Sequence, residues 1–109
     1  MSKTFADIHV RETSIRELQV IPGVGKSIAK DLYRVGIRHV SDLVGKRPES
    51  LYEKSNLLAG LRQDPCLLYV FRCAVYFAEN SNPKKEKLKW WYWKDKEYDG
   101  RPFRRADHY

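Results

Sequence analysis

The residues best placed to do chemistry lie in a glycine-rich turn at positions 21–26, which reads IPGVGK. Pro22 cannot continue a helix that precedes it, and Gly23 and Gly25 can take the positive φ of a tight reversal. Neither glycine carries a Cβ that would keep a ligand away from the backbone. A helix that begins directly after the turn presents amides without an intrahelical acceptor, and Lys26 adds a charge beside them. This pattern favours the binding of phosphate.

The same turn, followed by Ala29 and Leu32, resembles the helix-hairpin-helix motif. The resemblance implies binding to the DNA backbone without sequence preference, because hairpin amides contact phosphate oxygens in proteins of this kind. Carried over to this chain, the phosphate-binding positions of the hairpin are Gly23, Val24, Gly25 and Lys26.

Two other motifs share part of this pattern. Gly-Lys-Ser at 25–27 ends like a nucleotide-binding P-loop, but that signature needs a glycine where Val20 stands and a strand leading into the turn. Helix-hairpin-helix DNA glycosylases that use a catalytic lysine place it two residues after the second glycine, with an aspartate further along the chain. Those positions hold Ser27 and Gly45. We therefore expect no catalytic residue in this turn.

Two short helices should position the turn. Ser14 and Glu17 have the spacing of a capping box, so we expect the first helix from about 15 to 20, with Ile15 and Leu18 buried. The second should run from 25 or 26 to 35 and end at Gly36, a natural C-cap.

Basic residues recur at every fourth position of the second helix: Lys26, Lys30 and Arg34. They form a stripe that begins at the anion-binding end of the helix. Such a stripe is often only a solvated face, but beside this hairpin we expect it to face DNA. Three further basic residues are weaker candidates for nucleic-acid contacts: Arg38, Lys46 and Arg47.

The middle of the chain repeats the logic of the hairpin in degenerate form. Positions 36–43 should hold a helix stop, an apolar plug and a one-turn helix. The next helix should start at Pro48 and turn Leu51, Tyr52 and Leu58 inward. After Asp64, an N-cap, positions 65–80 are apolar on nearly every face, so this helix should be covered on several sides as the centre of the core.

The C-terminal quarter is both basic and aromatic. Positions 84–109 hold nine Lys or Arg and five Asp or Glu, interleaved with rings that could stack on bases. Trp90 and Trp93 lie three apart, on one helical face, so we favour packing of these two against the central helix over base stacking.

Composition limits the classes of function. A chain of 109 residues forms one domain, and 21 basic against 14 acidic residues give a net charge of +7, which favours an acidic partner. No apolar segment has the length of a signal peptide or a membrane span, so the expected location is cytoplasmic.

Cys66 and Cys73 lie about 10 Å apart along one helix, too far for a disulfide. No histidine or cysteine spacing indicates a metal, and we expect no cofactor.

A second resemblance covers about residues 13 to 96. Leu51-Tyr52, the run LYVFRCAVY at 68–76 and the block LKWWYWKD at 88–95 are similar to the small bacterial pathogenicity-locus family, sometimes labelled mitomycin-resistance proteins. The resemblance implies a helix-hairpin-helix fold and hints at a link to DNA damage, but the family has no established biochemical activity.

Together these patterns predict an all-α, compact orthogonal bundle of about five short helices, similar to helix-hairpin-helix and SAM domains, with a central apolar helix and an irregular tail. The expected divisions are an N-terminal arm at 1–13, a domain at 14–96 and a flexible tail at 97–109. Within the domain lie the complete hairpin at 15–35, its degenerate second half at 37–59, the core helix at 65–80 and an aromatic-basic segment at 84–96.

The expected function is non-enzymatic binding of duplex or junction DNA without sequence preference. The alternative is a protein-protein interaction module that presents the aromatic block, and an enzyme ranks third. Neither a membrane nor a small-molecule substrate is expected as a partner.

Overall fold

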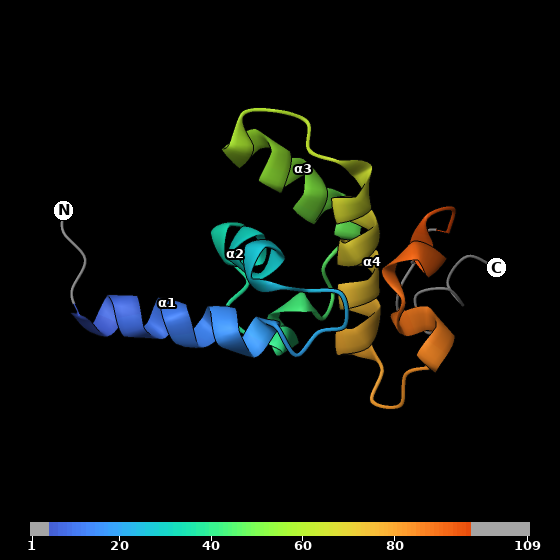
Figure 1. Cartoon of the computed structure of the whole chain (residues 1–109), viewed down its shortest axis with the longest axis horizontal. Coiled ribbons are helices and arrows are strands. Elements are labelled where there is room, and N and C mark those ends of the chain that lie inside the picture. The colour runs from blue at the N-terminus through green and yellow to red at the C-terminus, as the bar shows by residue number, and fades with distance from the viewer. Residues whose placement is uncertain (1–4, 97–109) are drawn as a thin grey trace.

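A computed structural model describes residues 5–96, which form α-helices and short 3-10 helices with no β-strand among them (Figure 1). In chain order these are α1 (Phe5–Leu18), α2 (Lys26–Arg34), η1 (Val40–Leu43), α3 (Pro48–Ala59), α4 (Pro65–Glu79), η2 (Lys85–Leu88) and η3 (Trp90–Trp93). The all-α class is confirmed. In place of about five short helices, the described chain has four α-helices and three 3-10 turns.

Helix α4 is the centre of the molecule, as its apolar sequence predicts. In Figure 1 it stands between α2 and α3 on one side and the η2–η3 segment on the other. Phe71 and Ala74 are fully buried in the main core, and Val75 is nearly so. The Asp64 side chain caps the helix by accepting the amide hydrogen of Cys66 at 2.8 Å. Full burial of a large apolar side chain such as Phe71 or Val75 contributes about 1.5 to 3 kcal/mol, so α4 accounts for a large part of the stability.

The aromatic segment packs on the far side of α4. Trp93 is 4% exposed and joins Tyr76 and Cys73 in a second buried cluster, while Trp90 is half-buried against both clusters. Trp91 points outward and is 58% exposed. The expected packing of Trp90 and Trp93 against the central helix is confirmed.

Arg72 links this segment to the rest of the fold. Its side chain is buried on α4, where Nη1 donates to the carbonyl oxygen of Trp93 at 2.9 Å and Nε lies 3.4 Å from a carboxylate oxygen of Glu49 on α3. A buried cation needs partners of this kind, because an unpaired charge is expensive in the interior.

Helix α1 is longer than expected. It begins at Phe5 rather than near Ile15, so the expected arm at 1–13 is wrong for residues 5–13; residues 1–4 lie outside the described chain. Ser14 is not a cap but a buried residue inside the helix. The predicted burial of Ile15 and Leu18 is confirmed. The predicted flexible tail at 97–109 also lies outside the described residues.

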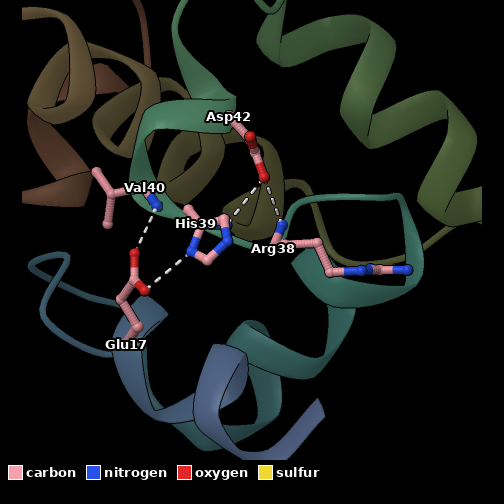
Figure 2. Close-up of polar contacts among 5 residues, drawn as sticks. All are labelled: Glu17, Arg38, His39, Val40 and Asp42. Atoms are coloured by element: carbon pink, nitrogen blue, oxygen red, sulfur yellow. Dashed lines mark hydrogen bonds and ion pairs between the residues drawn. The ribbon is translucent and has the colours of Figure 1, made fainter. Parts of the chain in front are cut away.

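Glu17 has a long-range partner in place of the predicted local one. Its carboxylate accepts the amide hydrogen of Val40 at 3.2 Å and lies 3.1 Å from Nδ1 of His39 (Figure 2). Asp42 in turn accepts the amide hydrogens of Arg38 and His39 at 2.9 and 3.0 Å. This cluster fixes the loop before η1 against the last turn of α1.

The ends of α2 and α3 follow from glycine. Gly36 has φ +101°, and the amide of Ile37 donates to the carbonyl oxygen of Leu32 at 3.0 Å, which terminates α2 as predicted. Gly60 has φ +73° at the end of α3. The inward placement of Leu58 is wrong: it is 56% exposed, because no element in the described chain covers the last turn of α3. None of the helices within residues 5–96 is long and apolar enough to cross a bilayer.

Candidate nucleic-acid interface

The turn between α1 and α2 is held by its own backbone and by two buried side chains. The amide of Ile21 donates to the carbonyl oxygen of Leu18 at 3.2 Å, and the amide of Val24 donates to that of Ile21 at 3.0 Å. Ile21 and Val24 are both buried in the main core. The turn is therefore a fixed part of the fold, which keeps its exposed backbone in one arrangement.

Three amides of this turn are free of protein acceptors. Within residues 5–96, no carbonyl or side chain accepts from the amide of Gly23, Gly25 or Lys26, and Gly25 precedes α2 without a side-chain cap. All three residues are exposed. The structure differs from the expected set of phosphate donors at Val24, because its amide already donates to the carbonyl oxygen of Ile21 and its side chain is buried. The phosphate donors that the turn can offer are therefore at 23, 25 and 26.

The two glycines have different roles. Gly23 has φ +84°, a conformation that favours glycine, whereas a Cβ built on it would only be in van der Waals contact with Cδ1 of Trp90, at 3.4 Å. Gly25 has φ −91°, not the positive φ allowed for above, and a Cβ there would meet open space. The fold would accommodate a side chain at position 25. Because glycine has none, the start of α2 stays open to solvent there.

A groove of about 440 Å³ lies between α1 and α2 beside this helix start. We call it the basic groove; its lining residues are Arg11, Glu12, Ile15, Arg16, Gln19, Lys26 and Lys30. None of its four cations forms an ion pair with a residue of the described chain. Glu12 is the one acidic residue among the lining residues, so four cations face a single carboxylate and the groove favours an anion.

Arg11 and Arg16 are functional candidates that the sequence reasoning missed. The error follows from the late start assigned to α1, which left Arg11 in an arm outside any helix. Positions 11, 14, 15 and 18 follow the spacing of one helix face, and the last three are buried. This periodicity is the signal that would have extended the helix over Arg11. Arg16 already lay inside the expected helix, and only the packing of α1 on α2 places it in the basic groove.

Arg34, the third member of the predicted stripe, is engaged elsewhere. Its Nη1 lies 2.8 Å from Oδ1 of Asp31, and it does not line the basic groove. Burial raises the pKa of the Asp31 carboxyl, and the nearby Arg34 opposes that rise. The structure therefore brings Lys26 and Lys30 together with α1 and leaves Arg34 on the side of Asp31.

The weaker candidates are separate from the groove. Arg38 Nη1 donates to the carbonyl oxygen of Tyr33 at 3.0 Å, and its guanidinium lies 4.0 Å from the centre of the Tyr33 ring. Lys46 and Arg47 are exposed before α3, and neither lines the basic groove. These three residues do not complete a site with the hairpin.

A second hollow, of about 460 Å³, lies on the other side of α2. We call it the aromatic pocket; its lining residues are Gly23, Ile28, Asp31, Gln63, Asp64, Cys66, Leu67, Val70 and Trp90. Its thiol is not activated, since a hydrogen bond with Asp64 raises the pKa of Cys66. Burial raises the pKa of the other thiol, Cys73, to about 11. No group of three metal-ligating residues occurs within residues 5–96.

Comparison of the sequence with known proteins shows the family of the chain. The chain belongs to the family Cdd1, described as "Pathogenicity locus", whose model matches residues 11–99. It is also similar to "Mitomycin resistance protein McrB" of Streptomyces lavendulae, with 34% identity over 77 residues, which cover 71% of this chain and 70% of that protein. These matches confirm the resemblance to the small bacterial pathogenicity-locus family. No solved structure matches the chain at a significant level.

Proposed function

We propose that this protein is a non-enzymatic module that binds the DNA backbone without sequence preference. In this proposal α1, the glycine turn and α2 form a helix-hairpin-helix unit of SAM-domain-like type, and η1 with α3 forms its degenerate second half. The amides of Gly23, Gly25 and Lys26 would bind phosphate oxygens, and the cations of the basic groove would neutralise neighbouring phosphates.

The observation that carries the proposal is the open start of α2. Free amides at 25 and 26 lie at the positive end of a helix dipole, and Lys26 connects them to the basic groove. Backbone amides and lysines read charge rather than base identity, so the binding should be weak and independent of sequence. The raised pKa values of both thiols favour a binding role over nucleophilic catalysis.

The relative's name adds context. A protein named for mitomycin resistance suggests a role in DNA damage or maintenance, and we extend that suggestion to this chain as part of the proposal. Duplex or junction DNA in the cytoplasm would then be the partner.

The proposal is tested by titrating labelled duplex, single-stranded and junction DNA with the full chain at several salt concentrations. Each neutralised phosphate adds about 0.9 to the magnitude of the slope of log affinity against log salt, so one contact from each of the four cations of the basic groove predicts a slope of about 3.6. Lys26→Ala should lower that slope by about 0.9. Gly25→Ala should weaken binding without unfolding the protein, since its methyl group projects into open space.

Lys85→Ala is the matched control, because Lys85 is also an exposed lysine but lies on η2, away from the basic groove. It should leave the slope almost unchanged. Equal losses for Lys26→Ala and Lys85→Ala, or an affinity that does not change with salt, would refute backbone binding at this site.

The alternative function is a protein-protein interaction module. One observation favours it: Trp91 is 58% exposed, and large exposed rings are enriched at interfaces. Burial of Trp93 and the half-burial of Trp90 count against a contact surface made of the whole block. If Trp91→Ala abolishes a protein interaction in cells while DNA binding is absent, the alternative replaces the proposal.

A further inference from the structure

We infer that the aromatic pocket receives an unpaired nucleobase that carries adjacent N–H donors, with guanine the best fit. This inference rests on the proposed function, since it names the class of DNA that the same hairpin would prefer: strands with an unpaired guanine. The pocket shares Gly23 with the phosphate-binding turn, so a backbone held by the turn passes directly beside the pocket.

The first support is shape and apolar lining. A hollow of about 460 Å³ falls in the size range of small-molecule sites. Its lining includes three aliphatic side chains, those of Ile28, Leu67 and Val70, and one aromatic side chain, that of Trp90. Stacking on an aromatic side chain is a common way for a protein to hold an unpaired base.

The second support is the kind of polar group in the pocket, because its lining includes the carboxylates of Asp31 and Asp64 and the side-chain amide of Gln63, which offer hydrogen-bond acceptors. Both amide hydrogens of Gln63 are committed: Nε2 donates to Ser55 at 2.8 Å and to Asn56 at 3.0 Å. Only its Oε1 is left to serve a ligand. Asp31 uses Oδ1 for Arg34, and within the described chain no donor reaches its Oδ2.

These acceptors discriminate among the bases. Guanine presents N1–H and an N2 amino group side by side, which can donate two hydrogen bonds to one carboxylate. Thymine has a single N–H between two carbonyl oxygens, and those oxygens would face the acceptors of the pocket. Inside a duplex the guanine donors are bonded to cytosine, so only an unpaired guanine can offer them.

The test uses labelled duplexes that are identical except for one central unpaired nucleotide, guanine or thymine, titrated with the full chain at one salt concentration. The guanine bulge should bind about tenfold more tightly than the thymine bulge, as expected for one good two-bond contact. Asp31→Asn should remove most of this ratio and preserve binding to the perfect duplex. Asp31→Asn also weakens the contact that holds Arg34, but a general effect of Arg34 on DNA affinity acts on both bulges equally and cancels in the ratio of the two affinities. Glu53→Gln, the same change at an exposed carboxylate outside the pocket, should leave the ratio intact.

Equal affinity for the two bulges, with normal duplex binding, would overturn this inference and leave the proposed function standing.

If no DNA binds at all, the proposed function fails, and base binding in the pocket is then tested separately through the NMR signal of the Trp90 indole N–H. Guanosine should shift that signal more than thymidine does, which would identify a site for free nucleosides. No shift with either nucleoside, or a shift only with a lysine-rich peptide, would refute base binding; the second result would indicate a cationic side chain of a protein partner.

Discussion

Nδ1 of His39 lies 3.1 Å from Oε1 of Glu17, a residue that precedes it by 22 positions (Figure 2). The other oxygen of the same carboxylate accepts the amide hydrogen of Val40 at 3.2 Å. One side chain at the end of α1 therefore binds both the last residue before η1 and the first residue of η1. Because α1 ends at Leu18, one residue after Glu17, this contact also helps to fix where the chain leaves the helix and enters the glycine turn.

This pair should make stability depend on pH. The hydrogen bond to Glu17 raises the pKa of His39, so its contribution is complete below the unfolded value of about 6.5 and is lost as the pH rises through the folded pKa. The hydrogen bond to His39 lowers the pKa of Glu17, so that contribution is complete above about 4.3 and is lost as the pH falls through its folded pKa. The pair therefore stabilises most between about pH 4.3 and 6.5.

An NMR titration of the imidazole tests the pair directly. The pKa of His39 should lie above 6.5 in the wild type and move back toward that value in Glu17→Gln. The difference in Tm between wild type and Glu17→Gln should be largest inside the stated pH window and shrink above it. A pKa of His39 that does not respond to Glu17→Gln would show that the contact is absent in solution.

The two glycines of the turn should respond differently to alanine. Gly23→Ala places an L side chain at φ +84°, which costs about 1–2 kcal/mol, and brings its Cβ to 3.4 Å from Trp90. Gly25→Ala keeps φ −91°, meets no neighbour and should cost at most about 1 kcal/mol, the loss expected at an N-cap. Urea unfolding of both variants checks the order. A Gly25→Ala protein that is less stable than the Gly23→Ala protein would contradict the structure of the turn.

Arg11 and Arg16 should contribute to DNA binding as strongly as the lysines of α2. If each neutralises one phosphate, the double alanine variant should lower the salt slope by about 1.8, and Arg16→Ala alone should lower it by about 0.9. Arg62→Ala, an exposed arginine in the loop before α4, is the control and should have little effect. An unchanged slope in the double variant would confine the interface to the turn itself.

Arg72→Met should destabilise the fold by about 2–3 kcal/mol, although the new side chain is apolar and of similar length. The change removes a charged donor from the carbonyl oxygen of Trp93 and a partner from Glu49, and charge-assisted hydrogen bonds of this kind contribute about 1.5–3 kcal/mol. Urea unfolding measures the loss. A similar result for exposed Arg62→Met would mean that the loss of any arginine matters, and not the burial of this one.

Much of the fold could be predicted because its signals are local. Helix α4 is apolar on most of its faces, Asp64 and Pro48 mark helix starts, and Gly36 ends α2. Each of these signals depends on residues within a turn or two of one another. The conformation at Gly23 and the packing of Trp93 follow from equally short patterns.

The errors arose where a distant partner decides the outcome. Ser14 and Glu17 have the spacing of a capping box, yet Glu17 binds His39 and Val40 instead, and the helix continues through Ser14 toward the N-terminus. Leu58 follows the same helix face as Leu51, but only the start of that face is covered by other elements. The error at the candidate site has a local cause instead: the amide of Val24 donates to the carbonyl oxygen of Ile21, three residues earlier, and the residue types alone do not reveal this turn hydrogen bond.

The contrast between the two thiols has a practical use. Cys73 is fully buried, and its high pKa keeps it protonated under ordinary labelling conditions, whereas Cys66 is exposed at the rim of the aromatic pocket. A maleimide dye should therefore attach at a single position in the unmodified chain, most readily at mildly alkaline pH because Asp64 raises the pKa of Cys66. The protein thus carries its own attachment point for a fluorescent reporter, directly beside the turn at which DNA is expected.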